Sequence, residues 1–329
     1  MSLLLLPLSI AYGLVAAARR RWFGGRSIKL SVPVISVGNL TCGGTGKTPT
    51  VEMITAELVD RGWNPAILSR GYGAGPSDGN DEYRVLSENL PSVAHYQGAD
   101  RVAGGSEAIA AGADILVLDD GFQHLRIHRD LDLVLLDALR PFDSGRLLPA
   151  GLLREPIGSL AEADLVAVTR TQLVSEERRD AIAAFLDERF PGLPVLFLET
   201  KPVAWQELYG ATLDPGFLEG KKVCAFCGIG NPYSFELALD EMGIRIAGFR
   251  VFRDHQSYDR ATVEKLGAWA MDRGVDTIVM TQKDAVKIEG DWLKGQPGIS
   301  WLFLRIEQSI SSGGEAWLEA IEGLASGKD

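Results

Sequence analysis

The chain has 329 residues, of which 46% are hydrophobic and 23% are charged, and its formal net charge is −11. This is the composition of an ordinary globular protein, with room for two domains of about 100–200 residues. The net negative charge argues against nucleic acid as a partner, and three cysteines are too few for a disulfide framework.

The N-terminus is apolar and is followed by positive charge. Residues 1–18 carry no charged side chain and are rich in leucine, and Arg19-Arg20-Arg21-Trp22 follows directly. A signal peptide has its positive charge before the apolar run, so export is not indicated. The run is slightly short for a bilayer span of about 20 residues, and arginines after it favour a cytoplasmic location for the rest of the chain.

We therefore expect residues 1–26 to form a membrane-associated helix that inserts into, or lies on, the inner face of a membrane. The alternative is a buried N-terminal core helix, because apolar runs of this length also occur in protein interiors.

A glycine-rich segment, Thr41-Cys42-Gly43-Gly44-Thr45-Gly46-Lys47-Thr48, lies between an apolar run at residues 32–37 and a helix-like pattern at residues 48–59. Its glycines let backbone N–H groups turn toward an anion, its lysine suits the β- and γ-phosphates, and its last hydroxyl suits Mg²⁺. The pattern predicts a phosphate-binding loop, although a threonine stands where the first glycine is usual. We expect the phosphates to bind six residues: Gly43, Gly44, Thr45, Gly46, Lys47 and Thr48. A glycine-rich turn without a nucleotide is the alternative.

A second motif is the run Ile115-Leu116-Val117-Leu118-Asp119-Asp120-Gly121. Four apolar residues followed by carboxylates are typical of the strand that delivers an aspartate to Mg²⁺ in phosphate-loop enzymes. We expect Asp119 or Asp120, together with Thr48, to bind the Mg²⁺ of ATP or GTP. Gln123 and His124 come next, and they either orient a water or hydroxyl or are ordinary loop residues.

The remaining patterns predict an α/β fold in two parts. Residues 65–69 are predicted to form a strand, and continuous apolar runs at residues 115–118, 133–136 and 165–168 suit a parallel sheet that is covered on both faces. A second alternation of strands and helices begins near residue 222. We predict a P-loop NTPase-like kinase domain with a mainly parallel sheet at residues 27–200, a linker at 201–220 and a second, smaller α/β domain at 221–329.

Some polar residues remain ambiguous from their patterns alone. Asp81 and Glu82 end a loop at residues 73–80, and they form either a solvated turn or a base and a metal ligand. His255, beside Asp254, is one of four histidines in the chain. Cys224 and Cys227 lie in a predicted buried strand, where we interpret cysteine as a small apolar residue, with a redox or zinc site as the alternative.

Together these segments resemble the tetraacyldisaccharide 4′-kinases, the lipid A kinases of Gram-negative-type bacteria. The resemblance covers nearly the whole chain, and the blocks at residues 119–124 and 153–156 are specific to this family. The matching segments lie at residues 5–9, 19–20, 36–40, 43–49, 69–73, 119–124, 148–151, 153–156, 228–232 and 281–285.

The resemblance implies that the γ-phosphate of ATP is transferred, with Mg²⁺, to the 4′-hydroxyl of a lipid A disaccharide 1-phosphate. It implies that Asp81 takes the acceptor proton and that His255 tunes Asp81, with Glu82 as a neighbouring metal ligand. Asn80 and Tyr83 depart from the glycine and proline usual in the family beside Asp81.

We assign Gln123, His124 and Arg154 to the substrate. Gln123 and His124 could orient its hydroxyl, and Arg154 could bind its phosphate, because arginine suits phosphate. We expect the base and the histidine to lie in different domains, so that closure completes the site. We expect a monomer at the cytoplasmic face of the bacterial inner membrane. A membrane-associated P-loop ATPase of the partitioning or metal-chaperone kind is the second reading, and a degenerate nucleotide-binding scaffold is the third.

Overall fold

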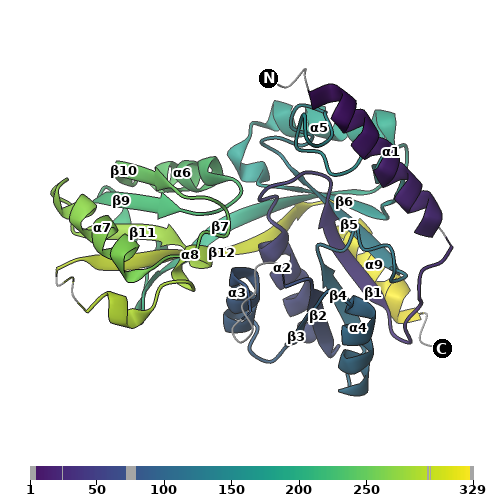
Figure 1. Cartoon of the computed structure of the whole chain (residues 1–329), viewed down its shortest axis with the longest axis horizontal. Coiled ribbons are helices and arrows are strands. Elements are labelled where there is room, and N and C mark those ends of the chain that lie inside the picture. The colour runs from purple at the N-terminus through teal and green to yellow at the C-terminus, as the bar shows by residue number, and fades with distance from the viewer. Residues whose placement is uncertain (1–4, 24, 72–78, 295, 297, 327–329) are drawn as a thin grey trace. The chain divides into compact units, whose positions relative to one another are not determined.

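The structure is a computed structural model of the whole chain, and it describes residues 5–23, 25–71, 79–294, 296 and 298–326 (Figure 1). It divides into two compact units. The first unit comprises Met1–Tyr72, Leu86–Thr200 and Gln308–Asp329, and the second comprises Gly73–Val85 and Lys201–Glu307. Each unit is described by itself.

The first unit is built on a parallel sheet with the strand order β6-β5-β1-β4-β2-β3, and the first part of β7 pairs with β6. Its elements are α1 (Leu6–Phe23), β1 (Val34–Asn39), α2 (Lys47–Asp60), β2 (Pro65–Ser69), β3 (Ala94–Gln97), α4 (Arg101–Ala110), β4 (Ile115–Asp119), β5 (Leu131–Asp137), η2 (Ile157–Glu162), β6 (Leu165–Thr169), η3 (Thr171–Leu173), α5 (Glu176–Arg189) and α9 (Gly314–Ser326). The predicted parallel sheet is confirmed.

Both faces of this sheet are covered at β4, β5 and β6, which explains why these strands are almost wholly apolar. On one face, Ile35 of β1 packs with Ile54 of α2 and Trp317 of α9. On the other face, β2 and β4 pack against α4, and β5 and β6 pack against α5. The sheet therefore sits between two layers of helices.

The second unit contains a smaller parallel sheet with the order β10-β9-β11-β12. Its elements are η4 (Pro215–Leu218), β8 (Thr212–Leu213), β9 (Lys222–Cys227), α6 (Pro232–Glu241), β10 (Arg245–Val251), α7 (Arg260–Met271), β11 (Thr277–Thr281), α8 (Gln282–Ala285) and η5 (Gly290–Trp292). Helix α7 covers one face of the sheet and α6 covers the other. Cys224 packs on the first face and Cys227 on the second, so the two thiols do not form a pair, and their interpretation as apolar residues holds.

Three elements run through the boundaries between the units: α3 (Asp81–Asn89), β7 (Val195–Glu207) and β12 (Ser300–Ser312). These boundaries differ from the expected ones. The segment 201–220 is not a bare linker, because it holds the end of β7, the strand β8, which pairs with β7, and the turn η4. Residues Gly73–Val85 group with the second unit, and Gln308–Asp329 group with the first. Of the predicted loop at residues 73–80, residues 73–78 lie outside the described residues.

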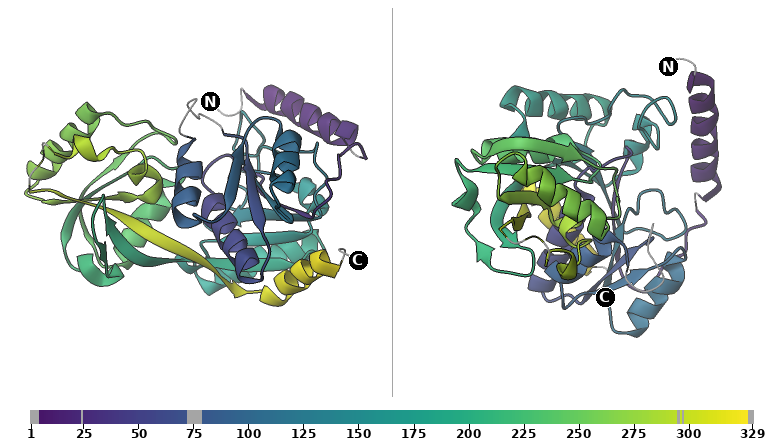
Figure 2. Two further views of the ribbon diagram at one scale, coloured as in Figure 1. Left: turned by 90° about the horizontal axis from the view of Figure 1, so that it is seen from below. Right: turned by 60° about the vertical axis from the view of Figure 1, so that its left-hand side comes forward.

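The predicted N-terminal helix is present as α1, at the edge of the first unit (Figure 2). It is not a core helix. Leu14 and Val15 are 67% and 68% exposed, and of the described residues of α1 only Ser9 is buried. Among the residues that the structure describes, no helix has both the length and the apolar character needed to span a bilayer.

Candidate active site

The glycine-rich segment forms a turn between β1 and α2, as predicted. Gly46 has φ +86°, a left-handed conformation that favours glycine, and it directly precedes the first residue of α2. The hydroxyl of Thr169 donates to the carbonyl of Thr45 at 2.9 Å, which fixes the turn. The N-terminus of α2 therefore presents backbone N–H groups at a rigid loop, the arrangement that suits a phosphate.

Lys47 is held at this loop by polar groups of the first unit. Its Nζ donates to Oδ1 of Asn39 at 3.2 Å and lies 3.7 Å from Oδ1 of Asp120. Thr48 follows in the first turn of α2 and is half-buried. The lysine is thus placed as a cation beside the loop, with its chain already oriented.

Asp119 and Asp120 lie at the carboxyl end of β4, as the sequence predicts. Asp119 is the last residue of the strand and is buried, whereas Asp120 has φ +55° and leaves it. Arg154 binds both oxygens of Asp120, at 2.7 and 3.0 Å. Burial alone would raise the pKa of Asp120, but Lys47 and Arg154 lower it far below its usual value. Asp120 is therefore a carboxylate, and Arg154 is oriented by it.

Gln123 and His124 lie just after these carboxylates. Gln123 donates from Nε2 to the carbonyl of Asn39 at 3.0 Å, so its amide supports the start of the phosphate loop. Burial, together with the nearby cations Arg101 and Arg126, lowers the pKa of His124 to about 4. Its imidazole is consequently neutral near pH 7 and is suited to hydrogen bonding rather than to charge pairing.

The second unit brings Asp81 and His255 together. Asp81 begins α3, and His255, with φ +57°, follows β10. Nδ1 of His255 lies 2.9 Å from Oδ1 of Asp81 and 3.2 Å from Oδ2. Burial alone would raise the pKa of Asp81, but the hydrogen bond from His255 and the charge of Lys283 lower it to about 2. The hydrogen bond from Asp81 in turn raises the pKa of His255.

Both partners belong to the same unit, which differs from the expectation that they lie in different domains. The start of α3 explains the local geometry. Asn80 caps the helix, because its Oδ1 accepts the N–H of Tyr83 at 2.9 Å. The two acids in the first turn are then stabilised by the helix dipole. Asn80 and Tyr83, which depart from the family pattern, thus build a helix start in this chain.

Two lysines for which no role is predicted lie beside the Asp81 carboxylate. Nζ of Lys283 lies 3.2 Å from Glu82 and 4.0 Å from Asp81, and Nζ of Lys287 lies 3.6 Å from Asp81. Burial alone would lower the pKa of Lys283, but its carboxylate neighbours raise it. Lys283 lies in the segment 281–285, one of the stretches that carry the family resemblance. Its place in that segment is the feature of the sequence that could have indicated a role for it.

Asp284, inside the second unit, holds Lys287 and the neighbouring turns in place. It is fully buried, and it accepts the hydroxyl of Tyr258 at 2.8 Å, the hydroxyl of Thr281 at 2.7 Å and the N–H of Gly228 at 3.1 Å. Lys287 lies 3.1 Å from the same carboxylate. The turn after β9 and the start of α8 are thereby tied to the lysine that faces Asp81.

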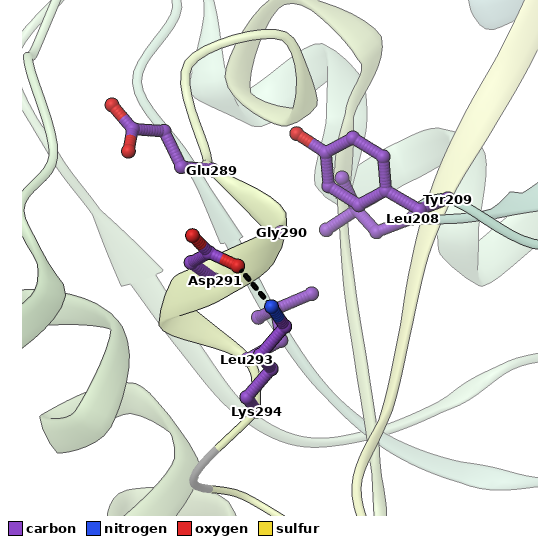
Figure 3. Close-up of a pocket in the computed structure, with 7 residues that line it drawn as sticks. All are labelled: Leu208, Tyr209, Glu289, Gly290, Asp291, Leu293 and Lys294. Atoms are coloured by element: carbon purple, nitrogen blue, oxygen red, sulfur yellow. Dashed lines mark ion pairs between the residues drawn. The ribbon is translucent and has the colours of Figure 1, made fainter.

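The predicted site residues therefore form two groups, one in each unit. The first unit holds the phosphate loop with the carboxylates, Gln123, His124 and Arg154, and the second unit holds Asp81, Glu82 and His255. A pocket of about 590 Å³ in the second unit is lined by none of them (Figure 3). Three of its polar side chains are engaged, because Tyr209 donates to the carbonyl of Ile288 at 2.7 Å and Lys294 pairs with Asp291.

The donor set of the first unit fits Mg²⁺ in its chemistry. A hydroxyl, that of Thr48, and the carboxylates of Asp119 and Asp120 are hard oxygen ligands. Among the described residues there is no group of three or more metal-binding side chains. Such a group is not required, since Mg²⁺ in nucleotide sites is usually bound by one or two protein oxygens together with phosphates and waters.

Comparison with known proteins gives a consistent result. Residues 1–323 match the family model of tetraacyldisaccharide-1-P 4′-kinase. The tetraacyldisaccharide 4′-kinase of Syntrophus aciditrophicus is 36% identical over 80% of this chain and 77% of its own length, and that of Geobacter metallireducens is 38% identical over 87% and 88%. The crystal structure of an LpxK from Aquifex aeolicus in complex with ATP has 29% identity and a TM-score of 0.75, over 98% of this chain and 99% of that one.

The family model and these relatives are those of a kinase family. They support neither of the two alternatives, the membrane-associated P-loop ATPase and the degenerate nucleotide-binding scaffold. The chain belongs to the tetraacyldisaccharide 4′-kinase family, the ATP-dependent kinases that phosphorylate the lipid A disaccharide.

Proposed function

We propose that this kinase activity is carried out by the two groups of residues described above, with Asp81 as the residue that accepts the proton of the 4′-hydroxyl. The observation that carries the proposal is the hydrogen bond from His255 Nδ1 to Asp81, at 2.9 Å. In phosphoryl transfer the acceptor is positioned by a carboxylate that takes its proton as the bond to phosphorus forms. A weakly basic aspartate serves this purpose, because the proton moves late in a loose transition state.

The roles of the other residues follow from their placement. Lys47 and the N–H groups of residues 43–48 bind the β- and γ-phosphates and compensate for their charge. Thr48, the aspartates at the end of β4 and Glu82 are the proposed ligands of Mg²⁺, which when bound neutralises phosphate charge. Arg154 is the proposed contact for a phosphate of the substrate, and Asp120 fixes its guanidinium until substrate binds.

His255 is proposed to orient Asp81 and to keep it ionised, so that it can accept a proton. Its Nδ1 faces the carboxylate, and its backbone N–H donates to Asp254 at 3.1 Å, which supports its left-handed backbone conformation. The acceptor proton would reach Asp81, whose carboxylate the adjacent imidazole would hold in position through the hydrogen bond.

We further propose that α1 places the enzyme on the cytoplasmic face of the bacterial inner membrane, where its acylated substrate resides. The helix exposes five large apolar side chains: Leu8, Ile10, Leu14, Val15 and Trp22. Arginines follow at its C-terminal end and suit anionic headgroups. Apolar and basic surface on one helix is the pattern of an interfacial anchor. We propose that the enzyme acts as a monomer.

The experiment is a transfer assay with γ-labelled ATP, Mg²⁺ and tetraacyldisaccharide 1-phosphate in detergent micelles, with wild type, Asp81→Asn and His255→Gln. We expect label on the lipid with wild type and a loss of kcat of about 10²-fold or more in both variants, the range typical of general acid–base groups. Asp259→Asn is the matched control, because Asp259 also lies in the second unit, its side chain accepts from Thr262 at the start of α7, and asparagine can cap a helix as well. Normal turnover of Asp81→Asn would remove Asp81 from the mechanism.

A further inference from the structure

Helix α1 is fastened to the first unit by polar contacts from one face. Ser9 donates from its hydroxyl to the carbonyl of Leu147 at 2.9 Å and accepts the N–H of Ala150 at 3.0 Å. Tyr12 donates to the carbonyl of Arg154 at 3.0 Å, and Arg19 donates to the carbonyl of Gln123 at 3.0 Å. A helix that served only as a tether would not need contacts along its whole length.

The contacts of Tyr12 and Arg19 end on residues assigned above to the substrate. Arg154 binds Asp120 through the two terminal nitrogens of its guanidinium, and Asp120 lies 3.7 Å from Lys47. Gln123 donates to the carbonyl of Asn39, whose side chain accepts from Lys47. Helix α1 is therefore hydrogen-bonded directly to Arg154 and Gln123, and each of these residues contacts a residue that orients or faces Lys47.

Arg20 provides the strongest of these attachments. Its guanidinium forms ion pairs with Glu155 and Glu162 and lies 4.3 Å from the centre of the Phe122 ring. The side chains of Arg20 and Glu155 are only 10% and 6% exposed, so the pair is shielded from solvent. Glu155 follows Arg154 directly in the sequence, and Phe122 lies between the carboxylates of β4 and Gln123.

Phe122 connects Arg20 to β1, the strand that precedes the phosphate loop. It packs against the backbone of Gly38 in β1 so closely that a Cβ atom at Gly38 would collide with it. Gly38 directly precedes Asn39, the residue that orients Lys47. Arg20 thus stacks on the ring of a residue whose backbone and Cβ pack on the strand that leads into the phosphate loop.

We infer that α1 is a built-in part of the nucleotide site, in which Tyr12, Arg19 and Arg20 are positioning residues for Arg154, Gln123 and the phosphate loop. The inference rests on the proposed roles of Lys47 and Arg154. It is separate from membrane binding, because Tyr12 and Arg20 are half-buried against the first unit and Arg19 donates to it, whereas Leu14 and Val15 are exposed and make none of these contacts. It predicts that ATP usage depends on α1 even where no membrane is present.

The test measures kcat and KM for ATP in detergent micelles for Tyr12→Phe, Arg20→Gln and Arg20→Lys, well below their melting temperatures. Tyr12→Phe and Arg20→Gln each have a matched control in the second unit. Tyr209→Phe also removes a hydroxyl that donates to a carbonyl, and Arg250→Gln also removes a guanidinium stacked 4.5 Å from an aromatic ring, that of Trp269.

We expect Tyr12→Phe and Arg20→Gln to lower kcat/KM for ATP by about 3- to 10-fold or more, the effect of losing one or a few hydrogen bonds. Arg20→Lys should recover part of the loss, because the charge opposite Glu155 remains. The controls should match wild type, and vesicle co-sedimentation of Tyr12→Phe should be unchanged.

The inference is overturned if Tyr12→Phe and Arg20→Gln use ATP as well as wild type, or if they lose vesicle binding alone. Either outcome would make α1 a tether only. The wild-type reaction in the same assay tests the proposed function independently: an active wild type with equally active α1 variants removes this inference and leaves the proposed function standing.

Discussion

Nδ1 of His255 lies 2.9 Å from Oδ1 of Asp81, although 174 residues separate them in the chain. The residues meet because α3 starts with Asp81 inside the second unit, to which β10 and the turn bearing His255 also belong. The pair is therefore formed within one compact unit. Its charge state can be probed by the stability of the protein alone, without substrate.

The first prediction concerns pH and the Asp81–His255 pair. The pKa of Asp81 is lowered from 3.8 to about 2, so the stabilisation from its charge is present above pH 3.8 and is lost as pH falls toward 2. The pKa of His255 is raised from 6.5, so its contribution is present below pH 6.5 and is lost as pH rises through the raised value. The melting temperatures of wild type and His255→Gln should differ most between about pH 4 and 6.5. A difference that is constant from pH 3 to 9 would show that the pair is not ionised as described.

The second prediction concerns Asp284. Because this fully buried carboxylate accepts three hydrogen bonds and faces Lys287, Asp284→Asn should replace an acceptor by a donor next to the N–H of Gly228. We expect the free energy of unfolding in urea to fall by about 3 kcal/mol, as for other broken buried charge pairs. Tyr258→Phe removes one of the same bonds and should cost only about 1 kcal/mol. If both variants lose equal stability, the ion pair with Lys287 is not the dominant contact.

The third prediction concerns Lys47. Lys47→Met keeps the length of the side chain and removes the charge that faces the phosphates. We expect kcat/KM for ATP to fall by about 10²-fold or more, as for other preorganised groups that stabilise a transition state. Lys29→Met is the control, since Lys29 is 70% exposed and pairs only at 3.4 Å with Asp130. Measured kcat/KM equal to that of the control would contradict the assigned role of Lys47.

The fourth prediction concerns the exposed face of α1. The double substitution Leu14→Ser with Val15→Ser removes two apolar side chains, each worth about 1.5–3 kcal/mol when fully buried. Partition into vesicles that contain anionic lipid should weaken more than about tenfold, as measured by co-sedimentation. Val59→Ser with Leu318→Ser changes exposed apolar residues on α2 and α9 and should partition like wild type. Unchanged partition of the α1 variant would exclude this face as the anchor.

Local patterns determined much of the fold. The strand predicted at residues 65–69 coincides with β2, and the phosphate loop and the carboxylates of β4 lie where their motifs indicate. These features depend on neighbours in the sequence: an apolar run buried on both faces, a glycine that adopts a left-handed φ, and acids at a strand end. The pairing of His255 with Asp81 was reached through the family resemblance, since neither residue carries a local signal that names the other.

The remaining features depend on contacts between distant residues, which a single sequence does not encode in its periodicity. Nothing local indicates that Lys287 faces Asp81, that Arg154 binds Asp120 or that Tyr12 reaches the carbonyl of Arg154. The helix start at Asp81 was missed because acids after a glycine-rich loop are equally typical of a turn. The second half of β7 falls in the segment predicted as a linker, because Pro202 and nearby glycines suggest irregular structure, whereas pairing of β7 with β6 and β8 keeps the strand extended.

The interleaving of the two units along the chain has a consequence for dissecting the enzyme. Trp317 of α9 is buried against the sheet of the first unit and donates to Glu57 of α2 at 2.7 Å, although it lies near the end of the sequence. Stopping translation after residue 200 would strip this helix from the nucleotide-binding core and leave apolar surface bare. A fragment that ends at residue 200 is thus not expected to fold by itself. A fragment designed to fold alone would also need α9, for example joined to it in a circularly permuted chain.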